Sequence, residues 1–210
     1  GAEFGYGRFQ DAERSMDHYH WENSASIESW YGKLTGHFGE SSAVSAFYLK
    51  NVQGLDGNSV DPDIKGAHVH AWGAGATIDL GDSGLNIDGD FIQTRGNRDL
   101  GHANLWTAGL NYGKVDLNKP GSFTLGVHYV RADAGAYLLG NSALDMTDQL
   151  EYGWDNGTGV KFWVAKAGVA VQKNVELDAY YNFGAKAFDR YDDSTKDPAN
   201  TWGVELNYAF

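Results

Sequence analysis

Histidine pairs are the residues of this sequence whose type and spacing come nearest to a metal site. His18 and His20 are two positions apart, as are His68 and His70, so each pair shares a face wherever the chain is extended. The first pair lies in a polar segment, which we interpret as a surface loop. The second lies on a predicted strand, where it continues a row of apolar residues beyond Trp72. We therefore predict no metal site and no cofactor.

A nucleophilic serine is the other chemistry to look for. Ser15 and Ser24 flank His18 and His20, but no orienting motif accompanies them, and nucleophilic catalysis needs a nucleophile, a base and an orienting group held together. The glycine-rich stretch 73–75 leads into neither a helix nor a Gly-Lys-Ser signature, so it does not match a phosphate-binding loop. The sequence predicts no catalytic residue, and we expect the protein not to be an enzyme.

Charged and amide side chains recur at alternate positions along several segments, which places them on one face of an extended chain. They are Lys33, His37, Asp79, Asp88, Asp90, Asn111, His128, Lys166, Glu176, Asp178 and Glu205. We interpret this face as the lining of a pore, whose excess of acidic groups would favour cations. The alternative is a filled interior held by ion pairs and hydrogen bonds, because a narrow barrel leaves little room inside.

The segments that carry these residues alternate apolar and polar positions with a period of two. In the last segment, Trp202, Val204 and Leu206 stand on one face, and Gly203 and Glu205 stand on the other. The same alternation recurs at 30–38, 72–80, 85–91, 106–113, 123–129, 163–172 and 175–183, and more weakly at 2–10 and 42–51. This pattern predicts about ten strands and no helix.

The connections between these segments alternate in length. Short connections are expected at 39–42, 81–84, 116–121 and 173–174, and long ones at 12–25, 52–65, 96–103, 133–157 and 185–200. Glycine, asparagine, aspartate and serine supply the conformations of the short turns. In a meander this alternation places all short turns at one end of the sheet and all long loops at the other, as in outer-membrane barrels.

Aromatic residues stand near both ends of the apolar face. One row, toward the long loops, contains Trp30, Trp72, Trp106, Tyr129 and Trp202, and the other, toward the short turns, contains Phe38, Tyr112, Phe123 and Tyr208. Two aromatic girdles around an apolar band are typical of a barrel that crosses a membrane. We therefore expect an all-β fold, a closed transmembrane antiparallel up-and-down β-barrel of about ten strands, formed by a single domain over residues 1–210.

Composition agrees with this interpretation. The net charge of −12 argues against binding nucleic acid, whose phosphates need a basic surface. The absence of cysteine excludes disulfides and thiolate metal sites. The sequence has no run of about 18 apolar residues, so it predicts no transmembrane helix. The low mean hydropathy of −0.46 agrees with a membrane barrel, which exposes only alternate residues to lipid.

The closing segment, Trp202-Gly-Val-Glu-Leu-Asn-Tyr-Ala-Phe210, resembles the last strand of bacterial outer-membrane β-barrel proteins, which alternates apolar residues and ends in an aromatic residue. A weaker resemblance links the chain to the porins of outer-membraned Firmicutes, in which an S-layer-homology domain precedes the barrel. The resemblance implies an integral protein of the bacterial outer membrane, surrounded by outer-membrane lipid and lipopolysaccharide. It also implies that Phe210 is an assembly signal for the barrel-assembly machinery.

Two functions remain open at this stage. The first is a porin-like channel for passive diffusion of ions and small hydrophilic solutes. The second is a plugged barrel that serves as a membrane anchor, an adhesin or a structural protein. Segment 133–157 contains Tyr137, Leu138, Leu139, Tyr152 and Trp154, which is too apolar for a plain solvated loop. It could fold into the lumen, meet a ligand, or pack between subunits of a homo-oligomer.

Overall fold

The chain forms one antiparallel β-sheet in a computed structural model. The structure describes residues 1–9, 27–39, 41–52, 70–95, 102–134, 157–189 and 194–209, together with Ala136, Gln149, Leu150, Tyr152 and Gly153. The strands are β1 (Ala2–Phe9), β2 (Ile27–Phe38), β3 (Ser42–Asn51), β4 (His70–Asp79), β5 (Leu85–Arg95), β6 (His102–Gly113), β7 (Phe123–Ala132), β8 (Gly159–Gln172), β9 (Val175–Phe188) and β10 (Thr201–Tyr208).

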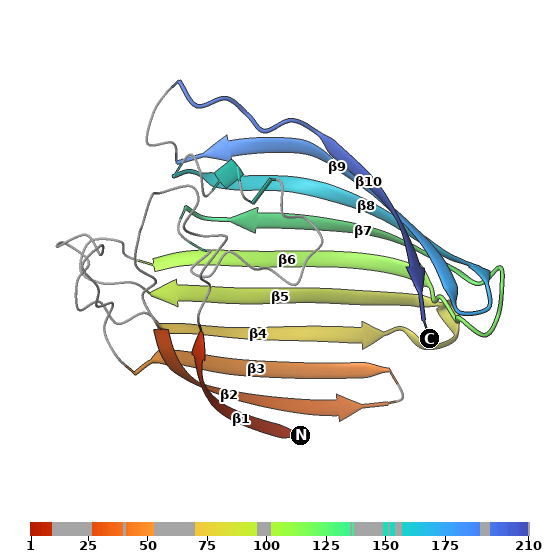
Figure 1. Ribbon diagram of the computed structural model, residues 1–210, viewed down its shortest axis with the longest axis horizontal. Helices are drawn as coiled ribbons and strands as arrows, with labels where there is room; N and C mark the ends of the chain where they lie inside the picture. Colours follow the sequence, from red (N-terminus) through yellow and green to blue (C-terminus); the bar gives the residue numbers. More distant parts are fainter. Residues whose placement is uncertain are drawn as a thin grey trace.

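The strands follow one another in space in the order of the sequence, from β1 to β10, and each pairs antiparallel with the next (Figure 1). This confirms the predicted all-β, up-and-down meander of ten strands. The connections between β2 and β3, β4 and β5, β6 and β7, and β8 and β9 are the short ones. Asn174, in the shortest of them, has φ 63°, a left-handed conformation that asparagine tolerates better than most residues.

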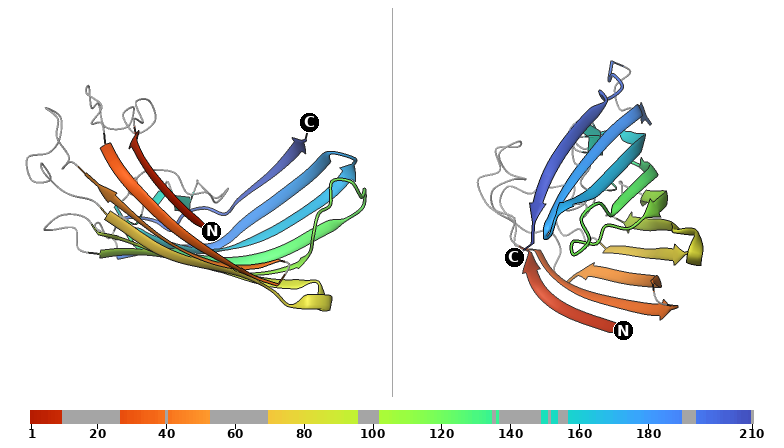
Figure 2. Two further views of the ribbon diagram at one scale, coloured as in Figure 1. Left: turned by 90° about the horizontal axis from the view of Figure 1, so that it is seen from below. Right: turned by 90° about the vertical axis from the view of Figure 1, so that its right-hand side faces the viewer.

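The predicted closure of the barrel is wrong for the sheet as it stands. Its strand order begins at β1 and ends at β10, so these two strands are its edges. The sheet curves into a trough, with β1 and β10 at opposite margins (Figure 2). Apolar and polar positions alternate in the same way in an open curved sheet and in a closed barrel. The pattern therefore predicts the two faces but not whether the edges meet.

Two short helical pieces were not predicted. A 3-10 turn, η1 (Gly81–Ser83), joins β4 to β5, and Gly81 and Gly84 on its flanks both have φ 69°, a conformation favoured by glycine. Gln149, Leu150, Tyr152 and Gly153 are also helical. A single 3-10 turn such as η1 is too short to give a helical period in the sequence.

The pairing registers give the sheet two distinct faces. Residues directly opposite each other on neighbouring strands point to the same side. Tyr48 pairs with Trp72, Phe91 with Trp106, Tyr129 with Trp163, and Tyr181 with Trp202. These eight aromatic residues therefore share one face, which is the convex outside of the trough. We call it the outer face and its opposite the inner face.

The buried core lies on the inner face near the long connections. It contains Ala103, Leu105, Val130, Ala132, Ala136, Leu150, Val160, Phe162, Val164 and Ala185. Most of these residues belong to β6, β7, β8 and β9, whereas Ala136 and Leu150 belong to the long connection that follows β7. These two residues therefore cover part of the inner face.

Candidate functional site

The polar face predicted from the sequence is the inner face of the trough. The registers place Lys33, Asp79, Asp88, Asp90, Asn111, His128, Lys166, Glu176, Asp178, Glu205 and His37 on this one face. They come from eight strands that all contribute to the same concave surface. What the sequence could not show is which of them meet, and the structure brings most of them into two groups.

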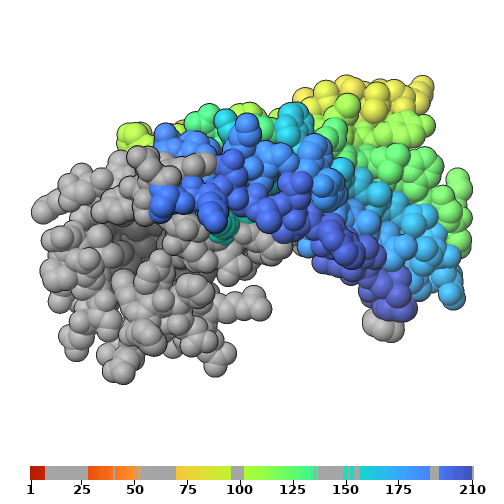
Figure 3. Space-filling model, turned by 90° about the horizontal axis from the view of Figure 1, so that it is seen from above, coloured from red at the N-terminus to blue at the C-terminus, as the bar shows by residue number. Residues whose placement is uncertain are grey.

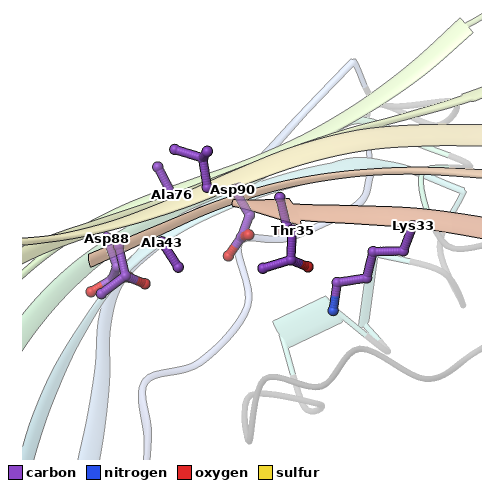
Figure 4. Close-up of a pocket in the computed structure, with 10 residues that line it drawn as sticks. Lys33, Thr35, Ala43, Ala76, Asp88 and Asp90 are labelled. Atoms are coloured by element: carbon purple, nitrogen blue, oxygen red, sulfur yellow. The ribbon is translucent and has the colours of Figure 1, made fainter. Parts of the chain in front are cut away.

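The first group lines a groove of about 450 Å³ across β2, β3, β4 and β5. Lys33 and Thr35 come from β2, and Asp88 and Asp90 from β5, and the side chains of all four point into the groove (Figure 4). The groove floor is made by small residues of β3 and β4 such as Ala43 and Gly75. A cation and two carboxylates thus share one open, polar surface.

A hydrogen-bonded cluster fixes Asp88 at one end of that groove. Asn111 donates through Nδ2 to Asp88 Oδ1 and to Asn86 Oδ1, the latter at 2.9 Å. His128 Nε2 lies 2.9 Å from Asn111 Oδ1, and His128 Nδ1 lies 3.4 Å from Asp88 Oδ2. Since Asn111 uses its amide N–H groups on Asp88 and Asn86, its oxygen must accept from His128. Asn111 is therefore the centre of the cluster and not merely a polar wall residue.

Glycines opposite these side chains make room for them. A methyl group at Gly109 would overlap the imidazole of His128 and approach Asp88 Oδ1 at 2.9 Å. At Gly126 it would overlap Asn111 Oδ1, and at Gly75 it would overlap Asp90. The concave face offers less space per residue than the convex one, so large polar side chains there require very small neighbours.

The second group lies on β8, β9 and β10. Asp178 pairs with Glu205 across the strands, and Asn207 donates through Nδ2 to Asp178 Oδ2 at 2.9 Å. Lys166 lines the same recess, of about 240 Å³, together with Asp178 and Glu205. As in the first groove, carboxylates outnumber the single lysine.

The connection after β7 docks on the inner face through Gln149. Its Nε2 donates to the carbonyl oxygen of Ala199 at 3.0 Å and to Thr201 Oγ1 at 2.9 Å, and its Oε1 accepts from Asn182 Nδ2 at 2.9 Å. The hydroxyl of Tyr152 donates to the carbonyl oxygen of Lys196. Of segment 133–157, the described residues Gln149, Leu150 and Tyr152 thus contact the inner side of the sheet or the residues that lead into β10.

Leu150, beside Gln149, packs among the apolar inner-face residues of β6, β7 and β8. The sequence contains a signal for this contact. Near the long connections, Leu105, Val130 and Phe162 are apolar on the face that is otherwise polar. An apolar patch on a polar face indicates that something covers it.

The predicted girdle residues all lie on the outer face. The registers put Trp30, Trp72, Trp106, Tyr129 and Trp202 toward the long connections, and Phe38, Tyr112, Phe123 and Tyr208 toward the short ones. Many of these rings are exposed, with Trp202 reaching 74%. Neighbouring rings also touch: the centroids of Trp106 and Tyr129 are 5.1 Å apart. The side chains of β9 and β10 form one margin of this surface (Figure 3).

Several predicted residues lie outside the part of the chain that the structure describes. These are Ser15, His18, His20, Ser24, His68 and Phe210. His70, the partner of His68, is the first residue of β4 and stands on the outer face beyond Trp72. Within the described ranges there is no group of three or more side chains suited to hold a metal ion. No helix there is long and apolar enough to cross a membrane.

Comparison with known proteins does not assign the chain to a family. Neither a protein-family model nor a curated protein sequence matches it.

Proposed function

We propose that this chain forms the wall of a water-filled pore in a bacterial outer membrane, through which ions and small hydrophilic solutes diffuse passively. The observation that carries the proposal is the division of the sheet into an aromatic, apolar outer face and a charged inner face. The outer face would meet lipid and the inner face would meet water.

The outer face is poorly suited to water. Every one of the ten strands exposes a large apolar side chain there, from Phe4 on β1 to Trp202 on β10. Soluble monomers rarely expose a continuous apolar surface of more than a few hundred Å². A lipid environment removes this cost, and the rings at both ends of the face would lie at the two membrane interfaces.

Lipid also imposes a condition on β1 and β10. Unpaired backbone N–H and C=O groups are not tolerated in the hydrocarbon region, so both edges need strand partners there. Antiparallel pairing of β1 with β10 keeps the rings of these two strands outside if even-numbered residues of one strand face even-numbered residues of the other. Phe4 and Tyr6 would then stand opposite outward residues such as Leu206 and Tyr208.

Cations are the preferred solutes. Among the predicted inner-face residues, Asp79, Asp88, Asp90, Glu176, Asp178 and Glu205 carry negative charge, against Lys33 and Lys166. Fixed charges in a narrow polar channel act at short range, where salt screens them poorly. Asp88 contributes less to this cation preference than Asp90, because Asn111 and His128 hold the carboxylate of Asp88.

One observation favours a second candidate, a plugged barrel used as an anchor or adhesin. Gln149 and Leu150 are docked firmly on the inner face, and they reduce the space between β6 and β9. Such a segment narrows a pore or fills it. Conductance distinguishes the two functions, since a plugged barrel passes no current.

The experiment is a planar-bilayer recording of the purified protein under a salt gradient. We expect open channels whose reversal potential shows a preference for cations. Replacing Asp90 and Asp178 together by asparagine should shift that potential toward anions, and the shift should shrink near 1 M salt, where the Debye length is about 3 Å. The control replaces Asp82 and Asp116, in exposed turns, by asparagine and should leave selectivity nearly unchanged.

Absence of conductance in correctly inserted protein would favour the plugged barrel. A channel that prefers anions would contradict the charge argument while leaving the pore itself intact.

A further inference from the structure

Basic side chains form a belt on the outer face near the long connections. One lies on each of seven adjacent strands, β3 to β9. They are Lys50, His70, Arg95, His102, Arg131, Lys161 and Lys186. We call them the basic belt. It is unexpected on a chain whose net charge is −12.

The registers join these residues into two rows. Lys50 pairs with His70, His70 with Arg95, and Arg95 with His102. In the second row, Arg131 pairs with Lys161, and Lys161 pairs with Lys186. The strands are about 4.8 Å apart, so each row is a close series of cationic or imidazole groups.

The belt follows the aromatic row that faces the long connections. On β3 the next outward residue after Tyr48 is Lys50, and on β7 the next after Tyr129 is Arg131. On β8, which runs in the opposite direction, Lys161 stands two residues before Trp163. On these strands the basic group is one outward position farther from the apolar band than the ring, and on β5 and β6 Arg95 and His102 are two positions farther than Phe91 and Trp106. If the rings lie at the membrane interface, the belt lies at the height of the lipid headgroups.

Arg131, Lys161 and Lys186 place three cations side by side, and Asp133 is an acidic residue next to them. Asp133 approaches Arg131, with Nε and Oδ1 3.7 Å apart, but it also accepts hydrogen bonds at Oδ2 from Asn104 N and Nδ2, both at 3.0 Å. Like charges directly opposite each other on neighbouring strands destabilise a sheet. An external anion would relieve this repulsion.

Two of these cations lie close to the ring of Phe188. The guanidinium carbon of Arg131 lies 4.4 Å from the centroid of the Phe188 ring, and Lys161 Nζ lies 6.0 Å from it. Both charged groups thus converge near one ring on the outer face. Their convergence is suited to an anion with several oxygens, since arginine donates in a fork and lysine acts as a point charge.

We propose that the basic belt binds the phosphate groups of an anionic glycolipid of lipid A type in the outer leaflet. The inference rests on the proposed membrane function and adds a specific lipid contact to it. A phosphorylated glycolipid fits because its phosphates lie at headgroup height while its acyl chains lie along the outer face. Several neighbouring cations can engage its phosphates together.

The test uses the full chain inserted into phosphatidylcholine nanodiscs. Insertion is checked first by heat-modifiable migration on gels. Binding is then measured with fluorescent lipid A, with lipid A from which both phosphates have been removed, and with phosphatidylglycerol. We expect binding of lipid A at least about tenfold tighter than that of the dephosphorylated form, because each cation near an anionic headgroup contributes.

The decisive variant replaces Arg131, Lys161 and Lys186 together by glutamine, and it should lose about tenfold in affinity for lipid A. The matched control replaces Lys114, Lys119 and Lys173, exposed near the short turns, by glutamine. It removes the same charge and should bind as the unaltered protein does.

Equal losses in both variants would overturn the inference, because the effect would then reflect net charge alone. Equal affinity for phosphatidylglycerol and lipid A would overturn the assignment to a glycolipid. Unaltered protein that inserts but shows no preference for phosphate would refute the belt while leaving the membrane proposal intact. Failure to insert into any nanodisc would refute both.

Discussion

Replacing Leu110 by arginine tests which solvent the outer face meets. Leu110 lies on β6, between Ile87 on β5 and Val127 on β7, and Ile78 on β4 extends the same row. The row is apolar across these strands, and Leu110 is 44% exposed. It stands between the two aromatic rows, between Trp106 and Tyr112 of the same strand.

The expected magnitude differs sharply between the two environments. An arginine near the middle of the lipid-facing band of a barrel costs about 2–4 kcal/mol. This corresponds to roughly a 30-fold to 700-fold shift in the unfolding equilibrium, at tenfold per 1.4 kcal/mol. If the same face met water, an arginine at this exposed position would change stability by no more than about 0.5 kcal/mol.

The assay is reversible folding into phosphatidylcholine vesicles, followed by tryptophan fluorescence at increasing guanidinium concentration. The matched variant is Thr35→Arg on the inner face, where the new side chain enters the groove beside Asp90. We expect Leu110→Arg to lower the midpoint strongly and Thr35→Arg to change it little. Equal midpoints for the two variants, or a harmless Leu110→Arg, would refute the assignment of the outer face to lipid.

Three further predictions concern closure, packing and assembly. Cysteines introduced at Tyr6 and Leu206 should be joined within a single chain by a short bifunctional reagent in membranes, as seen on denaturing gels; cross-links between chains would show instead that the edges pair with another copy. Gly109→Ala should destabilise the fold by about 1–3 kcal/mol in the same vesicle titration, because its methyl group overlaps His128. Gly32→Ala, with open space around it, should be neutral or slightly stabilising, and equal effects at the two glycines would argue against inner-face crowding. Deleting Phe210 should reduce the amount of protein assembled in the outer membrane, measured as the heat-modifiable fraction, and unchanged assembly would count against its role as a signal.

The faces of the sheet were predictable from the sequence because a period of two is a local property. Each segment shows it independently, and short turns such as Lys173-Asn174 define how adjacent segments pair. The inner-face residues Asp88 and Asp178 and the outer-face residue Trp106 could thus be assigned without coordinates. Closure could not, because it depends on accumulated curvature and stagger over ten strands, which no single segment contains.

The contacts between inner-face residues were also beyond the sequence. Asn111 was predicted as a wall residue, but the register brings it beside Asp88 and His128, where it joins them. The docking of Gln149 depends on Thr201, more than fifty residues later in the chain. The basic belt also depends on the order of the strands. In the sequence Lys50 and Arg95 are scattered charges, and the strand order places both beside His70.

The distribution of side-chain volume across the sheet connects its sequence to its shape. Inner-face glycines such as Gly75, Gly109 and Gly203 stand where a methyl group would overlap a neighbouring polar or aromatic side chain. Rings of the size of Trp72 and Trp163 stand on the outer face, where side chains spread apart. A sheet with small residues on one face and large ones on the other bends toward the small side, since packing is dense on both. The trough is thus a consequence of the alternation that predicted the strands, and adding volume to the inner face should flatten it.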